Sequence, residues 1–286
     1  MISMITNFWH DILGYGYWRN AIMAGLIISL VCSWLSVYVV LRKMSFIGQG
    51  ISHSALGGFA LGILIFGGAA HYAIHVDAVA LVFCLAVAML IAFTSNYTKI
   101  SEDSAIGIFF VASMAMGAIF LNMKDDYNKD VYSYLFGSVL AVDLTQLITT
   151  TVLSILVIVP LIIFHKELLY FTFDENMARV SGVSTTGFHI LLLTLLSITI
   201  IISSRIIGVL LVSAFLILPG TIAQLLTQNF RNMVIVSLLT GVATTFMGLF
   251  ISHVTDWPTG STIVIVQFIL FLLVFSIRKI QGNIHV

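Results

Sequence analysis

Long apolar runs follow one another along the chain, separated by short polar intervals. A helix that crosses the hydrocarbon core of a bilayer needs about 20 apolar residues, which is close to the length of these runs. Open strands cannot satisfy their backbone in lipid, and barrel strands show a weak two-residue alternation instead. We therefore predict an all-α fold, a polytopic transmembrane helical bundle of eight or nine spans. The expected spans lie near residues 20–41, 46–66, 72–94, 104–122, 140–164, 187–203, 206–228, 232–252 and 260–277.

The number of spans depends on residues 187–228. Ser203, Ser204 and Arg205 are the only polar interval there, and they barely make a loop. Either two spans meet at this point or one broken span crosses it. Pro219-Gly220 should kink or unwind the helix that contains it, because proline lacks the amide hydrogen of a regular turn. The carbonyl groups freed in this way could line a cavity.

The remaining segments complete a single domain over residues 1–286. We expect a short interfacial helix within residues 1–17, because Phe8 and Trp9 stand beside His10 and Asp11. No basic region precedes the first apolar run, so we expect a span there and no cleaved signal peptide. Residues 131–141 are too short to span alone and could form a re-entrant piece.

Composition supports the membrane assignment. Of 286 residues, 60% are hydrophobic and 8% are charged, and the mean hydropathy is +1.12. Soluble domains have about 25% charged residues, so most of this surface must face lipid. The net charge is zero, which gives no basic surface for nucleic acid. Cys32 and Cys84 lie in apolar runs without the spacing of a disulfide or zinc motif.

Basic residues orient the chain. With the N-terminus outside, the inner segments hold eight of them and the outer segments hold four, in line with the positive-inside rule. The inner set is Arg42, Lys43, Lys99, Lys166, Arg179, Arg231, Arg278 and Lys279, and the outer set is Arg19, Lys124, Lys129 and Arg205. Arg205 at a helix end should extend its charge towards water.

The longest polar interval within the predicted bundle, residues 165–187, falls on the cytoplasmic side. Asp174 is a suitable N-cap, Glu175 suits the first turn, Arg179 lies towards the end and Gly182 is a suitable stop. We expect a short helix near 174–182. From spacing alone it is either an amphipathic loop helix or a contact for another subunit.

A histidine near the middle of a predicted span is the first candidate for chemistry. His53 lies ten residues after Lys43, roughly 15 Å along a helix. Gln49 precedes it by one turn, on the same face. A polar residue at this depth needs a partner or a water-lined cavity. The small neighbours Gly57 and Gly58 permit close helix approach. His53 is therefore either a ligand on a transport path or a hydrogen-bonded residue of a tight interface.

Two polar sets are expected at the outer face. They consist of His71, His75 and Asp77, and of His253 and Asp256. Imidazole and carboxylate suit zinc or manganese, so both sets are candidates for an entrance, although hydrated boundary loops have the same composition. Neither set has the four ligands of a structural zinc site.

Other motifs, present or absent, limit the functions that the chain could have. Glu102-Asp103 begins a predicted span and is either a helix-capping pair or a gating pair. The sequence has no GxSxG and no HExxH. It also has no GxxxxGK[ST], so any ATP must be hydrolysed by another subunit.

Six stretches in chain order share a family pattern. They are Arg42-Lys-Met-Ser-Phe-Ile-Gly with Ile51-Ser-His-Ser-Ala, Ser101-Glu-Asp-Ser-Ala-Ile-Gly-Ile, Tyr134-Leu-Phe-Gly-Ser-Val-Leu-Ala-Val, Phe173-Asp-Glu-Asn-Met-Ala-Arg-Val-Ser-Gly-Val, Gly208-Val-Leu-Leu-Val-Ser-Ala-Phe-Leu-Ile-Leu-Pro and Asp256-Trp-Pro-Thr-Gly-Ser-Thr. They resemble, in the same order, the membrane permeases of bacterial ABC importers for zinc, manganese or iron. Together they cover most of the chain.

The resemblance implies a multi-pass protein of a bacterial plasma or inner membrane that is not itself an enzyme. It implies an ATP-binding cassette subunit, an extracellular or periplasmic metal-binding protein and a second permease as partners. The transported divalent ion would be the only cofactor, and none would be bound permanently. Residues 174–182 would form the coupling helix, with Asp174, Glu175, Arg179 and Gly182, and His53 would line the metal path.

One residue departs from the family pattern. The family usually has an aspartate where this chain has Gln49. A neutral amide suits a softer, nitrogen-preferring ion, which favours zinc slightly over manganese or iron.

Two other classes remain open from the residues alone. A secondary transporter driven by an ion gradient would need buried acids, and Asp143 is the sole candidate deep within an expected span. An intramembrane metalloprotease would need HExxH, which is absent.

Overall fold

The computed structural model describes residues 16–67, 73–98, 100–123 and 142–281. Over this part of the chain all regular elements are helices, and eight of them are long and apolar enough to cross a membrane. The all-α polytopic prediction is confirmed. The predicted interfacial piece in 1–17, the piece at 131–141, and His71 lie outside the described residues.

The chain forms two compact units, each built from separate stretches of sequence. Unit 1 comprises Met1–Val40, Ser133–Ile155 and Ser203–Val286, and unit 2 comprises Leu41–Tyr132 and Leu156–Ile202. The single-domain assignment stays a prediction.

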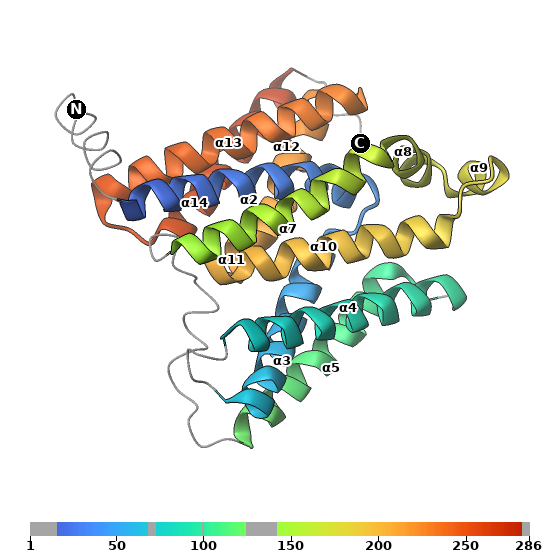
Figure 1. Cartoon of the computed structure of the whole chain (residues 1–286). Coiled ribbons are helices and arrows are strands. Elements are labelled where there is room, and N and C mark those ends of the chain that lie inside the picture. Colours follow the sequence, from blue (N-terminus) through green and yellow to red (C-terminus); the bar gives the residue numbers. More distant parts are fainter. Residues whose placement is uncertain (1–15, 68–72, 99, 124–141, 282–286) are drawn as a thin grey trace. The chain divides into compact units, whose positions relative to one another are not determined.

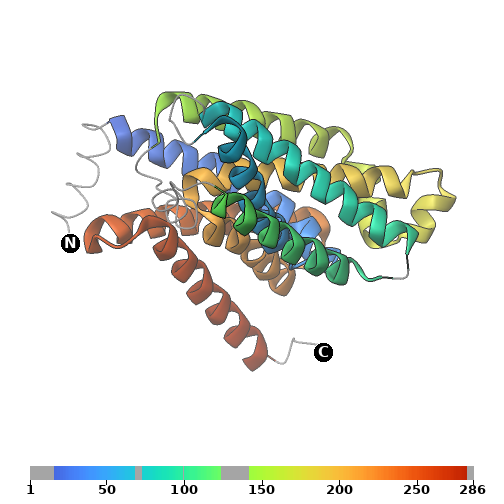
Figure 2. The ribbon, with the colours of Figure 1, turned by 90° about the horizontal axis from the view of Figure 1, so that it is seen from below.

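Unit 1 contains α2 (Gly16–Leu41), the start of α7 (Leu144–Ile163), and the helices α11 (Val209–Phe215), α12 (Leu218–Leu226), α13 (Phe230–Thr255) and α14 (Thr259–Ile280). Small polar residues on α2 permit its close packing. Ser36 Oγ accepts a hydrogen bond from the Gly220 amide of α12 at 2.8 Å. Ser237 of α13 donates to the Ser33 carbonyl at 2.6 Å. The α13–α14 turn places α14 obliquely to α13 (Figure 2).

Unit 2 contains α3 (Ile47–Phe66), α4 (Ala73–Tyr97), α5 (Glu102–Asn122), α8 (His165–Phe173) and α9 (Glu175–Val180), with most of α10 (Thr185–Ile207). Helix α3 packs against both α4 and α5 (Figure 1). A Cβ on Gly57 would lie 2.6 Å from the Ser113 carbonyl of α5, and one on Gly58 would lie 2.7 Å from Ala80 Cα of α4. The expectation that small residues permit close approach is therefore confirmed.

The structure after residue 187 differs from the sequence prediction, which placed a loop at Ser203–Arg205. Ser203 and Ser204 lie inside α10, which continues to Ile207. The break comes at Gly208, whose φ of 81° is available to glycine at little cost. The expected loop at Ser203–Arg205 is therefore wrong, because two serines do not end a helix that lipid and packing favour.

The effect expected of Pro219-Gly220 is present. The apolar segment is divided into α11 and α12, with Leu216 and Ile217 between them and Pro219 in the first turn of α12. Proline is tolerated in a first turn because those amide groups have no partner within the helix. The expected span at 206–228 is thus two short helices.

We predict that Gly58→Val destabilises unit 2. The new side chain would meet the α4 backbone, which cannot rotate away, at an expected cost of about 1–3 kcal/mol. The change is measurable as a lower melting temperature of the detergent-purified protein. Gly107→Ala is the matched control, because nothing lies within 4 Å of its Cβ position. Equal melting temperatures for the two variants would contradict the close α3–α4 contact.

Candidate functional site

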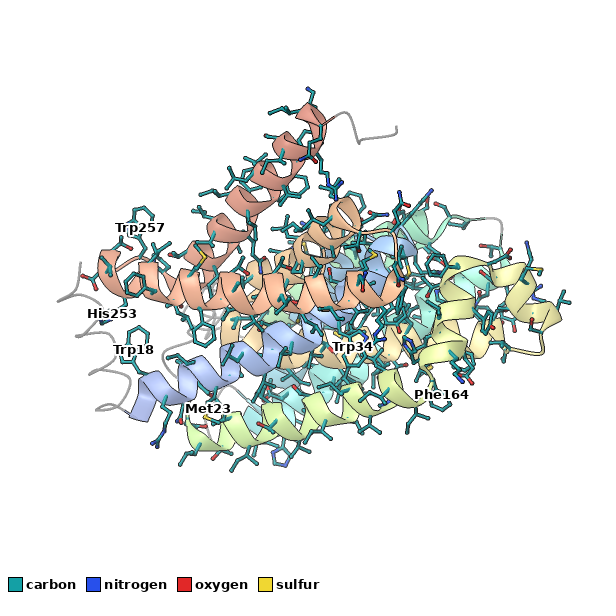
Figure 3. The ribbon with its side chains drawn as sticks, turned by 90° about the horizontal axis from the view of Figure 1, so that it is seen from above. Trp18, Met23, Trp34, Phe164, His253 and Trp257 are labelled. Atoms are coloured by element: carbon teal, nitrogen blue, oxygen red, sulfur yellow. The ribbon has the colours of Figure 1, made fainter. Side chains whose placement is uncertain are left out.

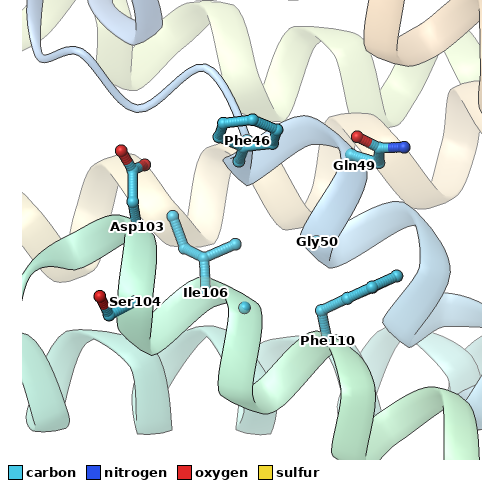
Figure 4. Close-up of a pocket in the computed structure, with 8 residues that line it drawn as sticks. Phe46, Gln49, Gly50, Asp103, Ser104, Ile106 and Phe110 are labelled. Carbon is cyan, nitrogen blue, oxygen red and sulfur yellow. The ribbon is translucent and has the colours of Figure 1, made fainter.

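A cleft lies between the start of α3 and the first turns of α5. Its volume is about 430 Å³, and its lining includes Gln49 from α3 and Asp103, Ser104 and Phe110 from α5. Figure 4 shows the amide of Gln49 and the carboxylate of Asp103 on these two different helices. The cleft is therefore lined by an amide and a carboxylate from two different helices, and by the aromatic ring of Phe110 further along α5.

The candidate His53 stands next to this cleft. It is half-buried, one turn beyond Gln49 on α3. Its ring packs against Phe110 with the centroids 5.2 Å apart and the planes at 69°. Phe110 therefore both lines the cleft and contacts the imidazole of His53. Because α3 begins at Ile47, His53 lies six residues into the helix, or about 9 Å, which is shallower than the sequence estimate.

The two sets expected at the outer face do not form a ligand cluster in the described residues, where no group of three His, Cys, Asp or Glu residues could hold a metal ion. The ring of His75 on α4 packs against the ring of Phe66 on α3, with the ring centroids 5.3 Å apart. Both line a cleft of about 450 Å³ whose other residues are apolar. Asp77 lies two residues further along α4.

His253 packs edge-on against Trp18, with the ring centroids 5.0 Å apart (Figure 3). Asp256 ends α13 with a left-handed φ of 55°, and the Trp257 carbonyl accepts a hydrogen bond from Ser252 at 2.7 Å. His75 and Asp77 belong to unit 2, whereas His253 and Asp256 belong to unit 1. Their role as an entrance stays a prediction.

A short helix occupies the polar interval, as its caps indicate. Asp174 Oδ1 accepts a hydrogen bond from the Met177 amide at 3.0 Å, which caps α9. Arg179 and Glu175 lie one turn apart, with 3.7 Å between Arg179 Nη2 and Glu175 Oε1. Gly182 follows the helix with a φ of 83°. The sequence did not indicate α8, which fills the first half of the interval and buries Leu168 and Phe171.

A partly buried charged cluster that includes Glu175 of α9 was missed from the sequence. Arg42 lies just after α2, and its side chain is 12% exposed. Arg42 Nη2 contacts Glu102 Oε1 at 2.8 Å, and Arg42 Nη1 contacts Glu175 Oε2 at 3.4 Å. His189 Nε2 of α10 lies 3.6 Å from the same Glu102 oxygen. Glu102 therefore forms an ion pair with Arg42. The N-cap of α5 is instead Ser101, whose Oγ accepts a hydrogen bond from the Ser104 amide.

Comparison with known proteins decides the family. Residues 14–278 match the model of the ABC 3 transport family. The chain belongs to this family. It is therefore a permease subunit of a metal ABC transporter, a multi-pass bacterial membrane protein, and not the subunit that hydrolyses ATP. This assignment excludes the secondary-transporter and metalloprotease alternatives.

Three similar proteins span nearly the whole chain. A "Probable metal transport system membrane protein" of Thermotoga maritima is 34% identical over 93% of this chain and 92% of its own. A "Manganese transport system membrane protein MntC" of Halalkalibacterium halodurans is 33% identical over 98% and 94%. The solved structure "PsaBC from Streptococcus pneumoniae in complex with Fab" has a TM-score of 0.81 at 30% identity, and covers 95% of each chain.

We predict that His53→Ala lowers metal uptake tenfold or more while the protein inserts in normal amounts. Alanine removes the imidazole donor but fits among small neighbours, so its effect on packing is small. Uptake of radiolabelled zinc and manganese by cells, normalised to the amount of protein in the membrane, checks this outcome. His53→Asn is the companion variant, because an interface role is partly restored by another hydrogen-bonding side chain. Parental uptake by the alanine variant would remove His53 from the path.

Proposed function

We propose that this permease conducts a divalent metal ion into the cell past Gln49 and His53. The observation that carries the proposal is the cleft between α3 and α5, where Gln49 and Asp103 line one space and Phe110 connects it to His53. An ion leaving water needs replacement ligands. This arrangement offers an amide oxygen and an imidazole one turn apart on α3, and a carboxylate on α5.

A second copy of the chain would complete the path. Gln49 is exposed and His53 half-buried on unit 2, and the described residues of one chain hold no three-ligand group. Zinc commonly takes four ligands, and harder cations take more. Two permeases with these α3 faces opposed would double the number of donors, which favours a homodimer.

The donors give different preferences for the ion. Gln49 and His53 are neutral and by themselves favour zinc. Asp103 adds a hard carboxylate oxygen to the same cleft, which suits manganese, the ion in the name of the Halalkalibacterium relative. We propose that zinc and manganese are the competing cargoes, and that the balance of carboxylate and amide in the cleft decides between them.

Coupling to ATP would occur through α9. This six-residue helix exposes Met177 and Val180, at 61% and 85%, beside the exposed Arg179. Exposed apolar side chains next to charges suit a protein contact. We propose that an ATP-binding cassette subunit docks on α9, and that a binding protein outside the cell delivers the ion.

We expect Gln49→Asp to raise the preference for manganese over zinc by several-fold, because a carboxylate replaces an amide in the cleft that Asp103 also lines. The measurement is competition between unlabelled zinc and radiolabelled manganese in proteoliposomes that contain the whole transporter. Asp103→Asn removes a carboxylate from the same cleft and should shift the preference towards zinc. If neither variant changes the ratio, the cleft does not select the ion.

Arg179→Glu should weaken docking of the ATP-binding subunit. The side chain is 69% exposed, so the bundle should fold normally, whereas the reversed charge faces the docked partner. Co-purification of the ATP-binding subunit with the permease measures the effect. Arg231→Glu, at the start of α13, is a charge-matched control elsewhere on the chain. Parental co-purification of the Arg179 variant would refute docking on α9.

A further inference from the structure

One buried guanidinium joins the proposed docking helix to the walls of the cleft. Arg42 lies between α2 and α3 and forms its shortest ion pair, 2.8 Å, with Glu102 of α5. Its other terminal nitrogen lies 3.4 Å from Glu175 of α9 and donates to the Phe171 carbonyl of α8 at 3.3 Å. The guanidinium carbon also lies 4.1 Å from the centre of the Phe171 ring. The planar fork of arginine is suited to holding several partners in fixed directions.

A histidine of α10 contacts this ion pair, and α4 contacts that histidine. His189 of α10 is 1% exposed and places Nε2 3.6 Å from the Glu102 carboxylate. Its Nδ1 lies 3.3 Å from Asn96 Oδ1 at the end of α4. Arg42 and residues of α5, α8, α9 and α10 therefore form one cluster, which α4 reaches through His189. All of these residues belong to unit 2.

A contribution to folding stability alone does not explain why these charges are clustered. Removing charges from water costs free energy that their mutual attraction often does not exceed, so a buried ion pair is weak evidence for stability. Such a pair does restrict its partners to one arrangement. Arg42 Nε is buried without a hydrogen-bond partner, so the contacts through Nη1 and Nη2 determine where the guanidinium lies. A displacement of Glu175 must therefore either move Arg42 or break the 3.4 Å contact.

Both ends of the ion pair continue directly into the cleft. Phe46 lies four residues after Arg42 and lines the cleft, as does Gln49 on the first turn of α3. Asp103 lines it from α5 and is the next residue after Glu102. The Arg42–Glu102 pair thus connects the two chain segments that form the walls, while the Arg42–Glu175 contact reaches α9.

We propose that Arg42 is a positioning residue that transmits displacement of α9 to the α3 and α5 walls of the metal cleft. The inference rests on the proposed docking of the ATP-binding subunit on α9. When the docked subunit shifts α9, Glu175 pulls on the guanidinium, and the Arg42–Glu102 pair carries the movement to both walls. Arg42 contacts neither the ion nor ATP in this role.

The test measures metal transported per ATP hydrolysed by the complete transporter in proteoliposomes, with radiolabelled manganese and zinc as probes. Arg42→Gln should still co-purify with the ATP-binding subunit and hydrolyse ATP within about twofold of the parent. Metal transported per ATP should fall tenfold or more. Arg42→Lys retains the charge without the fork and should recover part of the coupling. Lys43→Gln removes an exposed charge one residue away and should retain the parental ratio.

Glu175→Gln keeps the test decisive if Arg42→Gln does not fold. Glu175 contacts Arg42 Nη1, so its neutralisation leaves the partly buried pair between Arg42 Nη2 and Glu102 in place. This variant should also lower metal per ATP, and adding Arg42→Gln to it should lower the ratio little further, because both remove the same link. A parental ratio in Glu175→Gln, or independent and additive losses in the double variant, would overturn the proposal.

The two proposals fail in different ways. If α9 is not the docking site, Arg179→Glu co-purifies normally with the ATP-binding subunit. If α9 docks but Arg42 does not transmit its displacement, Arg179→Glu loses the ATP-binding subunit while Arg42→Gln transports metal at the parental ratio.

Discussion

The close packing of α3 between α4 and α5 is the constraint on which the rest of unit 2 depends. Gly57 and Gly58 bring the α3 backbone within contact of both neighbours, where a single added carbon would meet backbone atoms. In lipid, helices associate through such close packing because the hydrophobic effect between them is weak. With α3 fixed in this way, Gln49 faces α5 across the cleft and His53 meets Phe110. The positions of Gln49 and His53 therefore depend on glycines that have no functional group of their own.

Small residues and charged residues have different structural roles in the two units. In unit 1, serines on α2 let the broken segment of α11 and α12 approach, and Ser36 accepts the hydrogen bond of the Gly220 amide. In unit 2, the glycines set the helix spacing and Arg42 sets the relation of α9 to α3 and α5. Apolar packing holds the helices together, and a few polar contacts determine their register. This division is expected where most of the surface is lipid-facing and every buried charge is costly.

The sequence predicts the spans well because each is a long local signal. The proline break in 206–228 and the cap of α9 by Asp174 are equally local, and both are present. The Arg42 cluster could not be found in this way, because Glu102 and Glu175 lie 60 and 133 residues from Arg42. From the sequence, Arg42 was only one of the positive charges expected inside, and Glu102 a capping acid. The Gln49–Asp103 cleft was missed for the same reason, since two separate helices form it.

The shortness of α9 has a consequence for inhibitor design. Isolated helices shorter than about 12 residues are marginal in water, because nucleation is costly. The six residues of α9 keep their shape through the Asp174 cap, the left-handed Gly182 and the burial of Ala178. A synthetic peptide copied from 174–182 would lack the packing that buries Ala178 and would be largely unstructured. A molecule meant to compete with α9 for the proposed docking of the ATP-binding subunit would need a covalent constraint that holds these residues in helical form.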